Sequence, residues 1–128
     1  MIFMDHIIRV DYAIKVTSEN IDDIMATALE GGITYWCCKA EVVGEYLGEY
    51  ASEQISRGGE LKLYDAEDDE VYTLTQEKLL YGIKLAIENR YYNEYDWYNA
   101  NELDCCQIDA MVADAIIQCA LFDDVIYG

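Results

Sequence analysis

The sequence predicts an α+β fold in which a small antiparallel sheet packs with about four helices. Apolar and polar residues alternate at period two over residues 7–17, which predicts a long N-terminal strand. Two shorter alternating runs, 61–64 and 71–74, are joined by a polar turn and predict a β-hairpin. Strands joined by a short turn run antiparallel, and segments with helical periodicity fill much of the remaining chain. Since the chain has 128 residues and 53% hydrophobic content, we expect one compact domain over residues 1–128.

The first two elements follow from local patterns. The N-terminal strand would be half-buried through one apolar face made of Ile8, Val10, Tyr12, Ile14 and Val16. Thr17 and Ser18 then offer an N-cap, and acidic residues crowd the following turn, where the helix dipole favours anions. We therefore expect a first helix over residues 19–30, ended by Gly31 and Gly32.

The segment from Tyr35 to Arg57 has the longest helical pattern. Its apolar residues recur at a spacing of three or four and would form a buried stripe of Trp36, Ala40, Val43, Leu47, Ala51 and Ile55. Gly44 and Gly48 lie beside that stripe, where each costs a helix about 1 kcal/mol relative to Ala. Two interpretations stay open, because the glycines either break the helix or allow another backbone to approach closely.

The second half of the chain predicts two further helices. Thr75 caps a helix over residues 76–89, and Asp109 caps a last helix whose apolar face includes Met111, Val112, Ala115, Ile116, Cys119 and Ala120. Between them, residues 90–107 are rich in Tyr, Asn and acid and predict a long surface loop with at most a turn of helix. Residues 125–127 are apolar enough to add a short edge strand.

The charge balance restricts the classes of partner. The formal net charge is −18, and residues 91–128 contain eight acidic side chains and no Lys or Arg. Direct binding to nucleic acid or to an anionic membrane surface is therefore not expected, whereas a basic protein surface is a suitable partner. Disorder is disfavoured, because acidic disordered chains are poor in aromatic residues and this chain has twelve Tyr.

The cellular setting is predicted from three features. The first six residues lack the basic region and apolar run of a secretory signal, and no stretch reaches the roughly 18 apolar residues of a membrane span. The five cysteines are an odd number, which is typical of reduced thiols rather than a disulfide framework. We expect a cytoplasmic protein.

Two groups of acidic residues are candidate partner-binding sites. On the predicted long helix, residues four apart would form a ladder about 6 Å apart along the axis, made of Glu41, Glu45, Glu49 and Glu53. The hairpin turn adds Asp65, Glu67, Asp68, Asp69 and Glu70. Each group is either a solvated surface or an acidic ridge that competes with nucleic acid for a basic cleft. Calcium is not expected at the turn, because Glu70 and Gln76 occupy the positions where a calcium loop requires Gly and Glu.

The aromatic segment 91–98 interleaves five aromatic residues with two acids. Single-strand binders place such aromatics beside a positive groove, and this segment has the opposite charge. Three interpretations remain open: a loop that faces a partner, a loop that packs on its own domain, and a loop that binds a sugar or a cationic ligand. In the first, the anchoring side chains would be Tyr95, Trp97 and Tyr98.

Metal and catalytic residues are not predicted. The cysteines Cys37-Cys38 and Cys105-Cys106 are adjacent pairs without the two-residue spacer of zinc sites, and His6 is the single histidine. No serine lies in a nucleophile elbow, and no glycine loop suited to phosphate is present. We therefore expect no metal, no cofactor and no catalytic residue.

Two blocks of sequence resemble known proteins. The run ATALEGGITYWC at 26–37, and the ending Ala120-Leu121-Phe122 with Val125 to Gly128, are similar to small proteins encoded by phages and prophages of gut Firmicutes. The blocks cover about a quarter of the chain. The resemblance implies a phage setting but no activity and no functional residues. By analogy, small acidic proteins from such a setting include inhibitors of host defence nucleases that mimic nucleic acid.

Three functional hypotheses follow. The first is a non-enzymatic, acidic protein-binding module, a phage inhibitor that uses the candidate residues above to occupy the basic cleft of a host nucleic-acid-binding or defence enzyme. The second is a homo-oligomeric structural or accessory phage protein that associates through the glycine-bearing helix. The third is a small metal-dependent enzyme.

Overall fold

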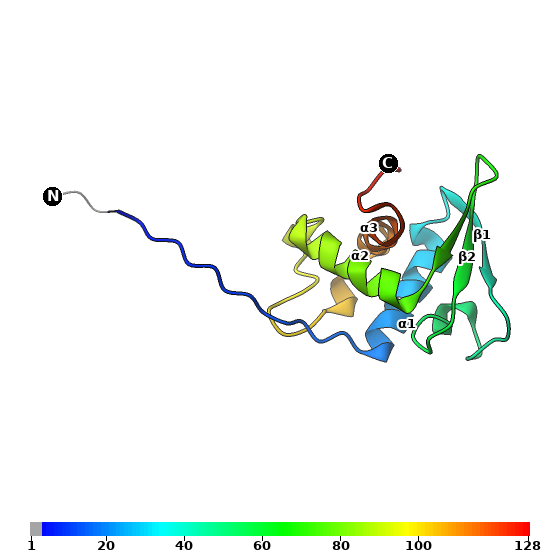
Figure 1. Ribbon diagram of the computed structural model, residues 1–128, viewed down its shortest axis with the longest axis horizontal. Coiled ribbons are helices and arrows are strands. Elements are labelled where there is room, and N and C mark those ends of the chain that lie inside the picture. Colours follow the sequence, from blue (N-terminus) through cyan, green and yellow to red (C-terminus); the bar gives the residue numbers. More distant parts are fainter. Residues whose placement is uncertain (1–3) are drawn as a thin grey trace.

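A computed structural model describes residues 4–128 and shows an α+β architecture, with a three-stranded sheet packed beside three helices (Figure 1). The strands are β1 (Cys37–Val42), β2 (Leu61–Asp65) and β3 (Val71–Leu74), and the helices are α1 (Ser18–Thr27), α2 (Gln76–Glu88) and α3 (Ala110–Phe122). Short helical turns lie at η1 (Ala28–Gly32), η2 (Ala51–Glu53), η3 (Asn93–Tyr95) and η4 (Cys105–Gln107). The α+β prediction is confirmed in this form.

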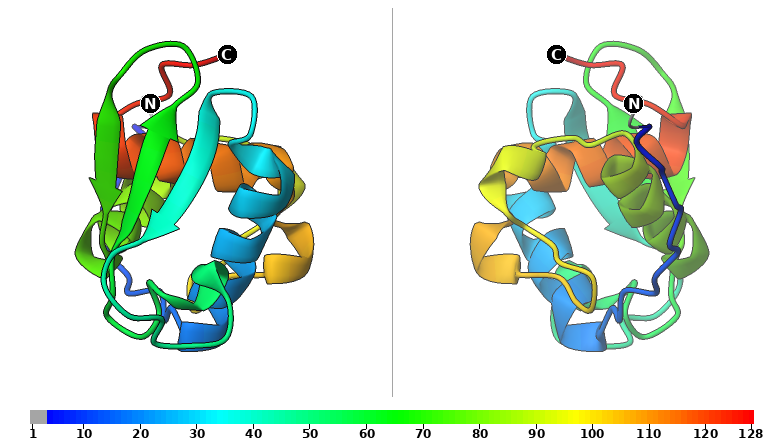
Figure 2. Two further views of the ribbon diagram at one scale, coloured as in Figure 1. Left: turned by 90° about the vertical axis from the view of Figure 1, so that its right-hand side faces the viewer. Right: turned by 90° about the vertical axis from the view of Figure 1, so that its left-hand side faces the viewer.

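The sheet is antiparallel throughout, in the order β1-β2-β3. Val42 pairs with Leu61, and Leu61 pairs in turn with Leu74. The β2–β3 hairpin therefore extends from one end of the sheet, and the loop that leaves β1 lies at the other end (Figure 2). The predicted hairpin is confirmed.

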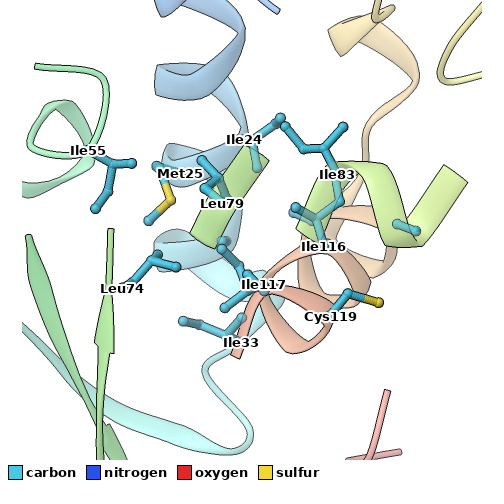
Figure 3. Packing of buried hydrophobic residues seen from close by; sticks show 14 of the residues in the cluster. Ile24, Met25, Ile33, Ile55, Leu74, Leu79, Ile83, Ile116, Ile117 and Cys119 are labelled. Carbon is cyan, nitrogen blue, oxygen red and sulfur yellow. The ribbon is translucent and has the colours of Figure 1, made fainter. Parts of the chain in front are cut away.

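The core forms where α3 packs against α2, α1 and the inner face of the sheet (Figure 3). Residues from all of these elements are completely buried, among them Ile24, Met25, Leu74, Leu79, Ile116 and Ile117. Helices α2 and α3 approach each other closely at Gly82, where an added methyl group would meet the Ile116 carbonyl oxygen of α3 and lie 2.7 Å from the Ala120 Cβ. The helices can approach this closely only because Gly82 has no side chain.

The predicted helix starts are confirmed for α1, α2 and α3. Thr17 accepts a hydrogen bond from the Asn20 amide at the start of α1, and Thr75 accepts one from Lys78 at the start of α2. Asp109 accepts one from the Val112 amide at the start of α3. Each cap satisfies a backbone donor that has no partner inside its helix, so the local sequence is sufficient to place it.

The prediction of a long N-terminal strand over 7–17 is wrong within this chain. Residues 4–13 are exposed and extend away from the rest of the molecule (Figure 1). The first backbone pairing is at Lys15, whose N–H donates to the Asn101 carbonyl at 2.8 Å and which forms a single parallel bridge with Glu102. The alternation gives the segment two chemically different faces, but a strand also needs a neighbouring backbone. Over residues 4–14 the described part of the chain supplies none. The expected absence of a secretory signal concerns a segment whose first three residues lie outside those described.

The prediction of a helix from Tyr35 to Arg57 is also wrong. The segment forms strand β1, an irregular loop over 43–50 and the short turn η2 (Ala51–Glu53), so that residues 4–128 contain three α-helices rather than the predicted four. Gly44 has φ of +76°, a left-handed conformation that ends β1 and cannot belong to an α-helix. Pairing with β2 satisfies the backbone that a helix would otherwise satisfy, so tertiary context overrides the weak helical periodicity.

The C-terminal residues 123–128 fold back against α3 and form no strand, so the predicted edge strand at 125–127 is absent from the described part of the chain. Among residues 4–128, no helix is long and apolar enough to cross a membrane.

Candidate functional site

The predicted glutamate ladder is not assembled, because its four residues lie on a strand, a loop and a turn. Glu41 is in β1, where its carboxylate lies 3.1 Å from the Lys39 ammonium group and accepts a hydrogen bond from the Tyr64 hydroxyl at 3.0 Å. Hydrogen bonds from Lys39 and Tyr64 hold the pKa of Glu41 below its ordinary value. Glu41 therefore has intramolecular partners and no regular spacing to the other three glutamates.

Glu53 has a structural role in the loop. One carboxylate oxygen accepts hydrogen bonds from the Glu49 and Tyr50 amides, both at 3.0 Å, and the other lies 3.5 Å from Arg57. The Tyr50 amide lowers the pKa of Glu53 most strongly, with smaller contributions from Glu49 and Arg57. Glu45 and Glu49 have exposed side chains in the same loop.

The loop over 43–50 combines acids with exposed apolar side chains that sequence analysis assigned to a helix. Tyr46 is 60% exposed, Leu47 48% and Tyr50 62%. Gly44 and Gly48, which punctuate this segment, were the sequence signal for a loop.

The hairpin turn has a buried carboxylate at its base. Asp65 is 6% exposed, and its Oδ1 accepts hydrogen bonds from the amides of Glu67 at 2.8 Å and Asp68 at 3.4 Å. Its Oδ2 accepts a hydrogen bond from the Tyr127 hydroxyl at 2.5 Å and from Tyr72 at 3.4 Å. The Tyr127 hydroxyl, followed by the Glu67 amide, holds the pKa of Asp65 below its ordinary value. Asp65 therefore fixes the turn and is not available to a partner.

The remaining four acids of the turn, Glu67, Asp68, Asp69 and Glu70, form what we call the acidic tip. All four are exposed. The Asp68 carboxylate accepts a hydrogen bond from the Glu70 amide at 2.8 Å, which further orders the turn. Within residues 4–128 the ion pairs join Lys39 with Glu41 and Arg57 with Glu53, so no cation of the described chain neutralises the tip.

The C-terminal tail holds the base of the acidic tip. The Tyr127 ring stacks on Trp36 with centroids 5.1 Å apart, while its hydroxyl reaches Asp65. Behind it, Gln118 is completely buried and accepts hydrogen bonds from the amides of Ile126 and Tyr127, both at 2.8 Å. The tail and the tip therefore lie at the same end of the molecule (Figure 2).

Asp114 of α3 completes this network. Its carboxylate accepts hydrogen bonds from the Tyr35 hydroxyl at 2.6 Å, the Trp36 indole at 2.8 Å and the Gln118 amide at 2.9 Å. Burial, and then the hydrogen bond to Asp114, raise the pKa of Tyr35 to about 12. This network could not be predicted, because its residues are far apart in the sequence and form no motif.

The three aromatic candidates have different environments. Trp97 is completely buried, and its indole N–H donates to the Tyr91 carbonyl at 2.9 Å. Tyr98 is half-buried and packs edge-on against Trp97, with centroids 4.8 Å apart. Tyr95 is 36% exposed and stacks on Tyr92. Trp97 is thus a core residue in this structure, whereas Tyr95 is exposed and Tyr98 is partly exposed.

Tyr95 borders a shallow hollow of about 490 Å³ on the surface. The hollow is lined by Glu94, Tyr95, Asp96, Cys106, Gln107 and Asp109. Three of these lining residues, Glu94, Asp96 and Asp109, are exposed acids.

The cysteines are free thiols, with Cys37 and Cys119 buried and Cys38 and Cys106 exposed. Within residues 4–128 no group of three or more His, Cys, Asp or Glu side chains is arranged to hold a metal ion.

Comparisons with protein-family models, with curated proteins and with solved structures found no match to this chain.

Proposed function

We propose that this protein is a non-enzymatic binding protein whose acidic tip docks onto a basic surface of a partner protein. The observation that carries the proposal is a run of four exposed carboxylates, Glu67 to Glu70, on a turn whose backbone is fixed by Asp65. A single exposed carboxylate without a neighbouring cation would not by itself indicate a binding surface. Four successive ones on an ordered turn make a concentrated negative potential of defined shape.

The order of the turn matters for affinity. A flexible acidic segment loses conformational entropy when it binds, whereas a turn already held by hydrogen bonds loses less. Asp68 supplies one of these bonds from within the tip, and Asp65, held by the Tyr127 hydroxyl, supplies another from the base of the turn. Long-range attraction from a net charge of −18 also accelerates the encounter with a basic surface.

We propose further that the basic surface is one that otherwise binds nucleic acid, as in a defence enzyme of a phage host. Duplex DNA carries about one charge per 3.4 Å along each strand. Consecutive residues are about 3.8 Å apart between Cα atoms, so the tip has a similar linear density of charge. Mimicry of nucleic acid predicts that DNA and the protein compete for one site.

The test uses a charge-reversal variant and a matched control. Glu67→Lys with Asp69→Lys reverses two tip charges whose side chains make no hydrogen bond that orders the turn. Glu30→Lys with Glu60→Lys makes the same change in net charge at two exposed acids away from the tip. Each immobilised protein is exposed to a lysate of a gut Firmicutes bacterium at low salt, and captured proteins are eluted with NaCl or with duplex DNA.

We expect the wild type and the control to capture a basic protein that the tip variant does not capture. Both NaCl and duplex DNA should release it. Equal capture by all three proteins contradicts the acidic tip as the binding surface. Release by NaCl but not by DNA retains the binding function and contradicts mimicry.

The two alternative hypotheses are affected differently. Association through a glycine-bearing helix is no longer a basis for oligomers, because Gly44 and Gly48 lie in a loop. A metal-dependent enzyme stays a prediction, which elemental analysis of the purified protein tests.

A further inference from the structure

The N-terminal arm, residues 4–17, exposes an unusual amount of apolar surface. Ile8 is 82% exposed, Val10 72% and Tyr12 56%. These residues alternate with polar ones, so an extended backbone places them on one face. An exposed apolar strand of this length is a template for pairing with another backbone.

Before Lys15 the arm has no backbone partner on either edge among the described residues, and one of its two edges is free along its whole length. Along a strand, successive residues direct their N–H and C=O groups to alternate edges. Lys15 directs its N–H toward Asn101, so the odd-numbered residues face that edge. The backbone groups of the even-numbered residues face the opposite edge, which is unpaired.

The apolar face of the arm borders a groove along α2. The groove has a volume of about 900 Å³. Its lining combines Val10, Tyr12 and Ile14 of the arm with Leu80, Ile83 and Ile87 of α2. A second strand added at the free edge of the arm would lie beside this groove.

We propose that the second strand is the arm of another copy of this chain, paired antiparallel in a register centred on Val10. In this two-fold arrangement Val10 faces Val10 of the other copy, and Ile8 faces Tyr12. Opposite residues of an antiparallel pair point to the same face, so both apolar faces turn toward the grooves along α2. The pairing uses the free edge of each arm and leaves the bond from Lys15 intact.

The charges of the arm select this register. Centred on Val10, Arg9 faces Asp11 and Asp5 faces Lys15, so all four charges of the arm gain an opposite partner. A register centred on Arg9 or on Asp11 places that residue against itself. A shift to Ile8 places Asp5 against Asp11, and a shift to Tyr12 places Arg9 against Lys15. A register centred between two residues pairs even-numbered with odd-numbered positions and puts the two apolar faces on opposite sides.

The charge on the rest of the molecule determines how the proposed dimer responds to salt. The arm has two acids and two bases and is neutral, so the remainder carries the whole net charge of −18. Two such bodies repel each other, and salt screens that repulsion. The dimer should therefore strengthen with NaCl, whereas a complex of the acidic tip with a basic partner should weaken.

Sedimentation equilibrium of the full chain at rising NaCl tests the proposal. We expect a species of twice the 14.7 kDa chain mass that increases with protein concentration and with salt. Arg9→Asp creates two like-charge pairs and should weaken the dimer about tenfold. Asp11→Arg should also weaken it about tenfold, although it makes the chain less negative, and the double swap should restore it.

Trapping with cysteines tests the register independently. Ile7 faces Ala13 at a non-hydrogen-bonded pair, where Cα atoms are about 4.5 Å apart and a disulfide can form. Ile7→Cys with Ala13→Cys should give a covalent dimer whose linked peptides join positions 7 and 13. Either substitution alone is the control, because its two copies would be about 20 Å apart. Mass spectrometry separates this link from any formed by the exposed thiols of Cys38 and Cys106.

A chain that stays monomeric at every concentration and NaCl level overturns the proposal. A dimer that is insensitive to the charge swaps, or that is not trapped between positions 7 and 13, overturns the register. Circular dichroism confirms that each variant keeps its helices, which is expected since the arm is exposed.

Discussion

Replacing Gln118 with Leu should detach the C-terminal tail and lower the free energy of unfolding by about 2–4 kcal/mol. Gln118 is completely buried and accepts hydrogen bonds from the amides of Ile126 and Tyr127. Its own amide group donates to Asp114 at 2.9 Å and to the Tyr127 carbonyl at 3.3 Å. Leu fills a similar volume but satisfies none of these groups. Each lost bond costs roughly 0.5–1.5 kcal/mol, and the sum is limited because a released tail regains hydrogen bonds with water.

Urea unfolding followed by circular dichroism measures this loss. Tryptophan fluorescence of the folded variant should also change, because Tyr127 stacks on Trp36 in the native protein. Gln107→Leu is a control, since Gln107 is exposed and its side chain makes no hydrogen bond in the described chain. If the free energy of unfolding of Gln118→Leu lies within about 0.5 kcal/mol of the wild-type value and its fluorescence is unchanged, Gln118 does not hold the tail.

Three further predictions concern packing, acid stability and thiol reactivity. Gly82→Ala should destabilise the protein by about 1–2 kcal/mol in a urea titration, after its gain in helix propensity is included, because the added methyl group would meet α3. Gly31→Ala is the control and should be neutral or stabilising, because no atom lies within 4 Å of its added methyl group. Because hydrogen bonds lower the pKa of Asp65, its carboxylate stabilises the fold above the ordinary aspartate pKa, and this contribution is lost as the pH falls through the lowered value. In Asp65→Asn the urea midpoint should fall less steeply in acid than in the wild type, and an unchanged acid limb contradicts this. Burial raises the pKa of Cys119 to about 11, so an aromatic disulfide reagent should label exposed Cys38 in the native protein and Cys119 only after unfolding.

Elements that are determined by residues close together in sequence were predictable. The starts of α1, α2 and α3 each follow from one capping side chain, and the β2–β3 hairpin follows from alternation on both sides of a polar turn. The segment Tyr35 to Arg57 was not predictable in this way. Its apolar spacing fits a helix, but strand β1 gains its stability from pairing with β2, which sequence periodicity does not include.

In the N-terminal arm a strand was predicted where none forms. Its alternation predicted a half-buried strand, which the structure does not form, because the pattern does not say which backbone supplies the hydrogen bonds. Pairing with another copy of the chain is the arrangement we propose.

The candidate site was predictable only in part. Composition alone placed a dense set of acids between the strands of the hairpin. The distinction between a buried, structural Asp65 and the exposed acidic tip required the contact with Tyr127, which is 62 residues away in sequence. Trp97 was a candidate anchor for a partner because Trp is common at interfaces, with packing on its own domain as an open alternative, and the fold buries it completely.

The salt dependence of partner binding by the acidic tip tests the central claim most directly. Affinities of the captured partner are measured over a range of NaCl for the wild type, for Glu67→Lys with Asp69→Lys, and for Glu30→Lys with Glu60→Lys. Affinity should fall steeply with salt for the wild type and for the control, and the tip variant should bind weakly with a shallow salt dependence. Equal affinity and equal salt dependence for the wild type and the tip variant would contradict that claim.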